Sequence, residues 1–222
     1  MYSTLKSETF SPVQVKEIQV KTNLSKIQFI ACPENEIKIT WHDTSKRTTK
    51  ANLTGDTLHI EDKAPITFYS TKGFIDLKRD NDISIEIPNT FCGDIHIEAT
   101  NEIVRILGLQ SCNRLSAQTR IANIECSSIS ANSISLTTIG GKIDLRGVSA
   151  TSRISLKTER GEINCICIDS AEDYLYDIHT NNRICEIIPP AGGNGPKIFQ
   201  AHSRHGAFHI QFNNEKGSEL PF

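Results

Sequence analysis

The chain has 222 residues, and its 24 Lys and Arg against 26 Asp and Glu give a formal net charge of −2. A hydrophobic fraction of 37% is ordinary for a folded protein and excludes a disordered chain. The lack of a basic surplus, with one Trp and four Tyr for base stacking, argues against nucleic acid as a partner. No apolar run approaches the length of about 18 residues that predicts a membrane span.

The chain also lacks the usual sequence signals for export and for cofactors. The first residues, MYSTLKSETF, have neither the basic start nor the apolar stretch of a signal peptide. Seven cysteines form no CxxC motif and no recognisable pairing pattern. Since unpaired thiols are typical of a reducing compartment, we expect a cytoplasmic protein, and we expect no cofactor.

Residues 1–82 are the less regular part of a predicted β structure. Ile18 and Val20 precede Thr22, and Ile27 and Phe29 follow it, so apolar side chains alternate with polar ones. This period of two predicts strands with one buried face. Further short strands are expected at Ile37–Ile39, Leu58–Ile60, Ile66–Phe68, Ile75–Leu77 and Ile83–Ile87.

A regular repeat follows. The segment ISLTTIGGKIDL, from Ile134, matches ISLKTERGEINC, from Ile154, with a Thr at the same place in each copy. We call this position the anchor. Anchors fall at Ala99, Thr119, Thr138, Thr158, Thr180 and Ser203, and subtraction gives intervals of 20, 19, 20, 22 and 23 residues. The earlier segment around Thr22 fits as a seventh copy.

The same positions around each anchor are apolar from copy to copy. Four residues before it stand Ile95, Leu115, Ile134, Ile154, Tyr176 and Phe199. Seven residues after it stand Ile106, Cys126, Leu145, Cys165, Ile187 and Ile210. In the fifth copy either Cys185 or Ile184 is expected to face inward. Ile168 is expected to join an apolar column ten residues after the anchor. Gly141, Gly161 and Gly206 share the position three after it, where we expect a positive φ.

Two short strands and a turn, repeated every 19–23 residues, predict one coil of a parallel β-solenoid, because each coil buries its apolar face only by stacking on its neighbours. The predicted fold is all-β, with residues 1–222 as a single domain. It comprises irregular coils over 1–82, regular coils over 83–212 and a tail over 213–222.

These residues also carry a family resemblance. The phrase ISIEIP (Ile83–Pro88), followed by serial copies of L-x-x-x-T-x-x-G-x-I-x-L, resembles the bacterial putative-adhesin family with β-strand repeats, a domain of unknown function. The resemblance covers about Ile18 to Phe212. The matching positions are core and turn residues, so the resemblance implies the fold. It supplies no catalytic residues.

One candidate site is a pair of outward carboxylates. Glu125 and Asp144 occupy the position six after neighbouring anchors, so we expect them on adjacent coils. Such a pair fits a cation site, or glycoside hydrolysis at separations of about 5–9.5 Å. The alternative is two solvated carboxylates neutralised by nearby bases such as Lys142.

A second candidate is a group of histidines in the last two copies. His179 and His202 stand just before their anchors and are expected to be stacked neighbours, and His209 is close in sequence. Imidazoles about 5 Å apart can share a transition metal or respond to pH. The alternative is a set of exposed histidines on a polar sheet.

A third candidate is a ladder of hydroxyls formed by Ser116, Ser135 and Ser155, three residues before their anchors. Such a ladder could contact a flat partner. The alternative is an ordinary solvated strand, and no G-x-S-x-G motif supports a nucleophilic serine.

We predict a non-enzymatic binding or scaffold protein that contacts a protein partner, or itself, through its lateral faces or coil ends. The alternative is a carbohydrate-binding or carbohydrate-active solenoid, with Glu125 and Asp144 as its carboxylates.

Overall fold

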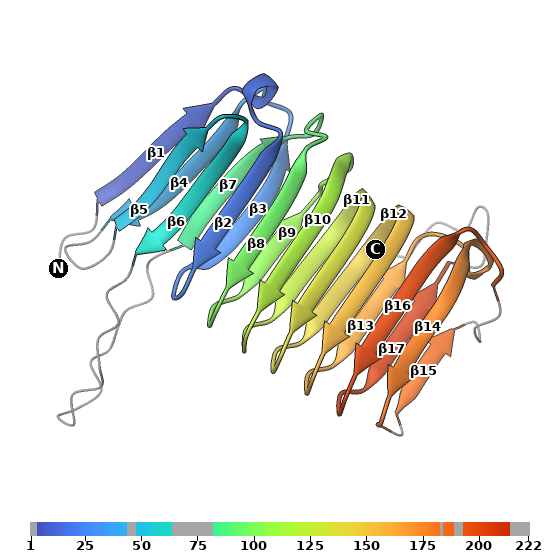
Figure 1. The fold of residues 1–222 in the computed structure, drawn as a ribbon. Coiled ribbons are helices and arrows are strands. Elements are labelled where there is room, and N and C mark those ends of the chain that lie inside the picture. The colour runs from blue at the N-terminus through green and yellow to red at the C-terminus, as the bar shows by residue number, and fades with distance from the viewer. Residues whose placement is uncertain (1–3, 44–47, 64–81, 183, 189–192, 214–222) are drawn as a thin grey trace, which may run out of the picture.

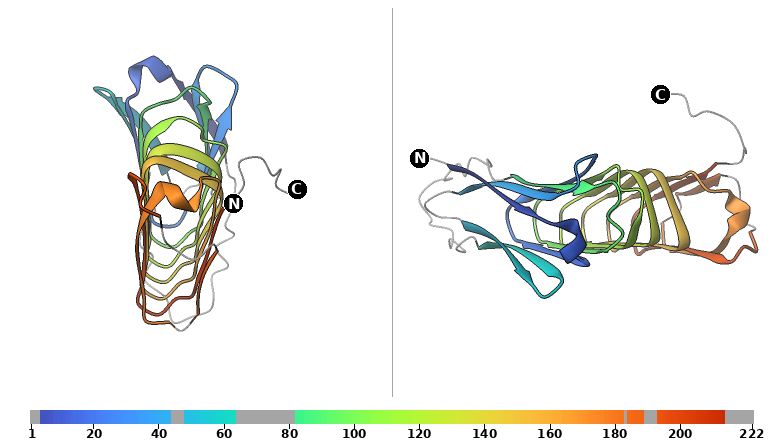
Figure 2. Two further views of the ribbon diagram at one scale, coloured as in Figure 1. Left: turned by 90° about the vertical axis from the view of Figure 1, so that its right-hand side faces the viewer. Right: turned by 90° about the horizontal axis from the view of Figure 1, so that it is seen from above.

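The computed structural model describes residues 4–43, 48–63, 82–182, 184–188 and 193–213. The described residues form 17 strands of one continuous sheet and two single-turn 3₁₀ helices, η1 (Pro12–Gln14) and η2 (Ala171–Asp173). The all-β prediction is therefore confirmed. The sheet folds round one elongated core, so that strands lie on two opposite long faces (Figures 1 and 2).

The first face carries nine strands in the spatial order β5, β6, β2, β8, β10, β11, β12, β16, β14. All neighbours are parallel except the β5–β6 hairpin. Their bounds are β5 (Thr48–Thr54), β6 (Thr57–Lys63), β2 (Glu17–Thr22), β8 (Asp94–Ala99), β10 (Cys112–Thr119), β11 (Ile124–Thr138), β12 (Ile143–Thr158), β16 (Lys197–Ser203) and β14 (Tyr174–Thr180).

The second face has the order β1, β4, β7, β3, β9, β11, β12, β13, β17, β15. Here β11 and β12 contribute their first halves, because both strands continue from this face onto the other. The remaining bounds are β1 (Thr4–Phe10), β4 (Ile37–Asp43), β7 (Asp82–Pro88), β3 (Lys26–Cys32), β9 (Val104–Leu107), β13 (Ile163–Cys167), β17 (Phe208–Phe212) and β15 (Cys185–Ile188).

The register places the predicted apolar columns side by side. Leu115 pairs with Ile95 on one side and with Ile134 on the other, and Ile134 pairs with Ile154. All four are buried. Each buried side chain of this size contributes about 1.5–3 kcal/mol, so the alternation seen in the sequence defines the core.

The anchor hydroxyls stabilise the turns that follow them. Thr138 accepts a hydrogen bond from the backbone N–H of Gly141 at 3.0 Å, and Thr158 does the same for Gly161 at 2.9 Å. Both threonines are buried. The repeat therefore contains Thr because its hydroxyl satisfies a buried backbone donor, a role that apolar side chains cannot fill.

The expectation of a positive φ at Gly141, Gly161 and Gly206 is wrong. None of the three has a positive φ; a Cβ on each would instead overlap the backbone carbonyl of the neighbouring turn. Positive φ occurs nine residues after the anchor, at Gly108, Ser128 and Gly147. Glycine is needed at the third position because adjacent turns approach closely.

One further expectation about inward residues is wrong. Ile168 is exposed, because β13 lacks the residue that Gly147 supplies in β12, so Cys167 pairs with Val148 instead. Cys185 does stand in the expected column, since it pairs with the buried Phe208, but it is exposed because β15 pairs with β17 alone among the described strands.

The less regular N-terminal part is also β-rich. The expected strands at Ile37–Ile39, Leu58–Ile60 and Ile83–Ile87 lie within β4, β6 and β7. Those at Ile66–Phe68 and Ile75–Leu77 lie outside the described residues.

The spatial order of the strands differs from their order in the chain at both ends. β14 and β15 lie outermost, and the later strands β16 and β17 are inserted between them and the rest (Figure 1). At the other end, β6 and β7 lie outside β2 and β3. Strands adjacent in the chain are therefore not always adjacent in the sheet.

A partly buried polar network joins the strands whose order is exchanged. Asp169, just after β13, accepts hydrogen bonds from the Tyr174 hydroxyl at 2.5 Å and the Ala150 N–H at 3.3 Å. The ammonium of Lys197 lies 3.1 Å from the same carboxylate. Tyr174 begins β14 and Lys197 begins β16, so one carboxylate fixes the starts of both strands. Burial raises the pKa of the Tyr174 hydroxyl, which keeps it a neutral donor.

Candidate functional site

The structure places the expected serine ladder on the outer surface of the first face. Ser116 pairs with Ser135, and Ser135 with Ser155, across three parallel neighbours. In the same column the register continues to Gln200 and then to Asp177. The ladder therefore leads along the face to the outermost strand.

Glu125 and Asp144 are also neighbours, on the second face. Each is engaged by a base: Arg105 Nε lies 2.7 Å from Glu125, and Arg146 Nε lies 3.2 Å from Asp144. Lys142 lies 3.9 Å from Asp144. Since both carboxylates are neutralised by partners on the same surface, the geometry favours the solvated pair over a catalytic one.

Glu125→Ala combined with Asp144→Ala is expected to leave the fold intact. The ion pairs are at the surface, so the free energy of unfolding should change by less than about 1 kcal/mol. Urea denaturation checks the stability, and a screen of polysaccharides checks for hydrolysis. Turnover by the original chain that the double variant loses would contradict the non-enzymatic interpretation.

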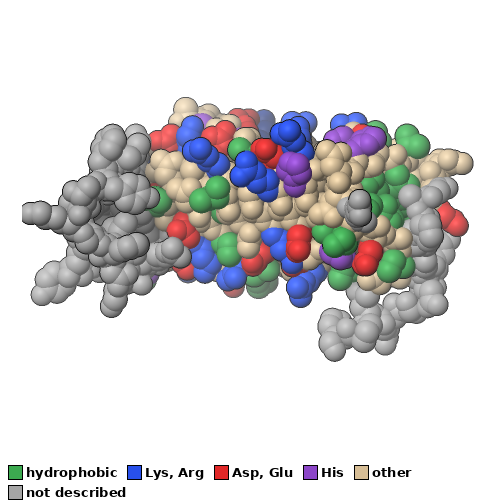
Figure 3. Space-filling model, turned by 90° about the horizontal axis from the view of Figure 1, so that it is seen from below, with side chains coloured by type: hydrophobic (Ala, Val, Ile, Leu, Met, Phe, Trp, Pro, Cys, Tyr) green, Lys and Arg blue, Asp and Glu red, His purple; other side chains and the backbone are tan. Residues whose placement is uncertain are grey.

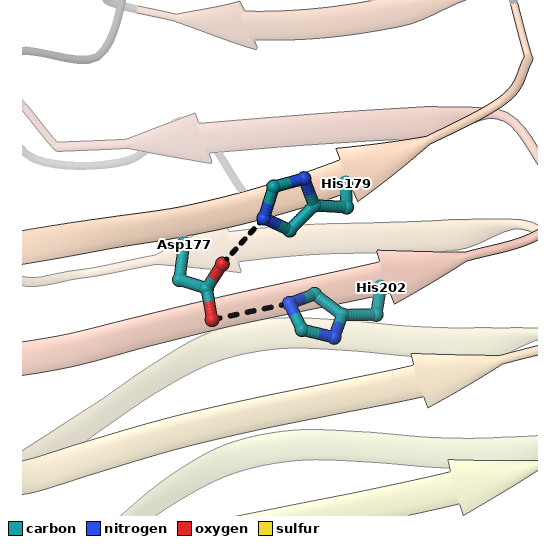
Figure 4. Close-up of side chains that lie close together, drawn as sticks. All are labelled: Asp177, His179 and His202. Carbon is teal, nitrogen blue, oxygen red and sulfur yellow. Dashed lines mark ion pairs between the residues drawn. The ribbon is translucent and has the colours of Figure 1, made fainter.

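Two of the expected histidines meet a carboxylate on the outermost strands of the first face. His179 on β14 and His202 on β16 pair in the register, with ring centroids 5.1 Å apart. Asp177, two residues before His179, lies between them: its Oδ1 is 2.8 Å from His179 Nε2 and its Oδ2 is 3.2 Å from His202 Nε2 (Figure 4). We call these three residues the terminal cluster.

The terminal cluster is only partly open to solvent. The side chain of His179 is 75% exposed, whereas His202 and Asp177 are each 38% exposed. His202 Nε2 itself is buried, and although it is close to Asp177 its angles do not make a hydrogen bond. The Gln200 amide donates to Asp177 Oδ2 at 2.9 Å, and this bond together with His202 lowers the pKa of Asp177. The carboxylate is therefore held ionised between two imidazoles.

His209 does not join the terminal cluster. It lies on β17, on the opposite face, with its Nδ1 3.0 Å from a Glu186 carboxylate oxygen. A shallow hollow of about 500 Å³ lies beside the terminal cluster and is lined by His179, His202, Lys157 and Arg204 among others.

Sequence reasoning missed two acidic residues. Asp177 lies two residues before His179 and therefore on the same outer surface, which is a signal that the strand period offers. Asp169 had no such signal, because its partners Tyr174 and Lys197 depend on the exchanged strand order.

The cysteines have the character of core residues, with Cys92 and Cys185 as the exposed exceptions. Burial raises the pKa of Cys112 to about 12 and that of Cys167 to about 11. Thiols with such pKa values are almost entirely protonated at neutral pH and are poor nucleophiles.

Acidic and basic side chains are interspersed along the face drawn in Figure 3, without a broad patch of either sign. Neither helix in the described part of the chain has the length and apolar character needed to cross a bilayer.

The described residues thus form an all-β architecture with two long faces, polar outer columns and surface carboxylates that are engaged by bases. The sequence model of the Toastrack DUF4097 family matches residues 15–218. The chain therefore belongs to this family, as the bacterial adhesin-like resemblance of its repeats led us to expect.

Solved structures share the fold at low sequence identity. A putative cell adhesion protein from Clostridium sporogenes has a TM-score of 0.57 and 9% identity, with 96% of this chain and 100% of that one covered. A putative adhesin from Bacteroides fragilis has a TM-score of 0.50 and 14% identity, with 95% and 97% covered. No curated protein matches the chain in sequence.

Proposed function

We propose that this chain is a non-enzymatic binding scaffold, a parallel β-solenoid of 19–23-residue coils that forms one domain over residues 1–222. The single apolar core running from Val15 to Phe212 supports one domain. The parallel register of corresponding repeat positions supports the solenoid. The Bacteroides fragilis protein that shares the fold is a putative adhesin, which supports a binding role.

The observation that carries the proposal is the pair of edge strands at the C-terminal end of the described residues. Among the described strands, β14 pairs only with β16, and β15 pairs only with β17. Each edge strand therefore presents backbone donors and acceptors to a further strand. Leu175 and Ile188 on these strands are 56% and 58% exposed, so the edge offers apolar contacts as well.

The N-terminal end is protected in the manner of natural sheet edges. Its edge strands are β1, which is antiparallel to β4, and β5, which is antiparallel to β6. β1 carries Lys6, which forms a 2.8 Å ion pair with Asp43, and β5 carries Lys50. Charged side chains on an edge oppose pairing with another chain. The two ends thus differ, and the binding partner we propose for the C-terminal end is a second copy of the chain, which brings a matching pair of strand edges.

Light scattering across a hundredfold range of concentration tests this self-association. We expect the molar mass to rise from 24.7 kDa towards twice that value. Leu175→Lys combined with Ile188→Lys should hold the mass at that of the monomer, because lysine on an edge strand opposes pairing.

The matched control is Ile121→Lys combined with Ile139→Lys, which places lysines at exposed isoleucines in turns away from the edge. It should associate like the original chain. A constant mass for the original chain, or equal loss in both double variants, would contradict end-to-end pairing.

We also propose a cytoplasmic location. The seven cysteines are all unpaired, which supports a reducing compartment. Fractionation of cells followed by immunodetection of the full-length protein tests the location directly.

A further inference from the structure

We propose that the terminal cluster binds one divalent transition-metal ion of the Zn²⁺ type and thereby fastens the outermost strand β14 to β16. The three ligand atoms, one each from Asp177, His179 and His202, all lie within 4.8 Å of one another. Two come from β14 and one from β16 (Figure 4). An ion held by all three would therefore connect the two strands.

The ligand set selects the class of metal. Imidazole nitrogen suits Zn²⁺, Ni²⁺ and Cu²⁺, whereas Ca²⁺ and Mg²⁺ require sets built from oxygen. With bonds of about 2.1 Å to each ligand, tetrahedral zinc needs ligand atoms about 3.4 Å apart. Asp177 Oδ1 lies 2.8 Å from His179 Nε2 and Oδ2 lies 3.2 Å from His202 Nε2, and one ligand atom from each residue lies within 4.8 Å of the other two, so rotation of the side chains would have to bring the three atoms to that spacing.

Two features indicate that the site is organised in advance. The Gln200 amide fixes the Asp177 carboxylate through a 2.9 Å hydrogen bond, the arrangement by which outer partners orient metal ligands. His202 Nε2 is buried, points to the carboxylate and makes no hydrogen bond. A buried polar atom that makes no hydrogen bond is costly, and a metal ion would give this nitrogen a direct bond beside its contact with the carboxylate.

The coordination would be incomplete with protein ligands alone. Three ligands leave a fourth position that water can fill. His179 and His202 also line the shallow hollow, together with Lys157, Glu159 and Arg204, so a ligand bound there would have access to an ion held by these histidines. The described part of the chain contains no other group of three His, Cys, Asp or Glu side chains at metal-binding distances.

Titration calorimetry of the full-length chain with ZnCl₂ tests the proposal, in a Cys92→Ser, Cys185→Ser background that removes the two exposed thiols. We expect one site per chain. Loss of a residue that only orients a metal ligand already weakens metal binding by about tenfold or more. His179→Gln and His202→Gln remove the ligands themselves, so each should weaken zinc binding by at least about tenfold.

His209→Gln is the matched control, because this histidine also contacts a carboxylate at 3.0 Å but has no second imidazole. It should bind zinc unchanged. Circular dichroism establishes that each variant is folded, and Co²⁺ absorption in the visible range reports imidazole ligation independently of heat. An absence of zinc binding, or binding that both cluster variants retain, would overturn the proposal.

Discussion

Gly141→Ala is expected to lower the free energy of unfolding by about 3 kcal/mol, the upper range for overpacking a closed site. A Cβ at Gly141 would overlap the carbonyl oxygen of Ala122 in the neighbouring turn. Neither backbone can move away freely, because Thr138 Oγ1 accepts the Gly141 N–H and donates to the Ala122 carbonyl. Urea denaturation followed by circular dichroism measures the effect.

The adjacent glycine supplies the control. A Cβ at Gly140 would come no closer than 3.8 Å to Ile121, so Gly140→Ala should change the stability by less than about 0.5 kcal/mol. Equal effects at the two positions would show that general flexibility, and not the close approach of neighbouring turns, explains the repeated glycine.

Asp169→Ala is expected to cost about 3 kcal/mol, since removal of one partner leaves other buried polar groups unsatisfied. It would leave the buried Tyr174 hydroxyl and the largely buried Lys197 ammonium without their shared acceptor. The loss should be concentrated at the C-terminal end. Hydrogen exchange is therefore expected to accelerate first in β14 and β16, ahead of global unfolding.

Asp173→Ala is the control, because this carboxylate lies 3.8 Å from the same Lys197 but is 48% exposed. Its loss should cost less than about 1 kcal/mol. Adding Lys197→Met to Asp169→Ala should recover part of the stability, since an apolar replacement of a buried pair is often tolerated. A double variant no more stable than Asp169→Ala would show that the ion pair is not the source of the effect.

The C-terminal end thus combines three features: an exchanged strand order, a partly buried polar network and the terminal cluster. The Asp169 network fixes β14 where it begins, at Tyr174, whereas His179 lies near the end of the same strand. The prediction for Asp169 and the prediction for zinc binding can therefore be tested separately. Loss of Asp169 should weaken the strand with or without zinc, whereas loss of His179 should matter only when the metal is present.

Most of the described strands and their inward side chains could be predicted from the sequence. Apolar residues such as Leu115, Ile134 and Ile154 recur at one offset from the anchor, and a period of two leaves only one face on which they can be buried. Counting positions from the anchor also correctly predicted that His179 and His202 are neighbours. It also placed Glu125 beside Asp144.

The adjacency of strands at the two ends could be read only from the tertiary structure. The same holds for the reason why particular residues occupy the turns. Two coils with similar apolar columns stack equally well in either order, so periodicity does not distinguish β14 from β16 as the outermost strand. The contacts of Asp169 with Tyr174 and Lys197 distinguish these two strands. The reason for Gly141 likewise lies in a backbone about 20 residues away, at Ala122. Local sequence encodes local periodicity, whereas such close approaches exist only once the coils have stacked.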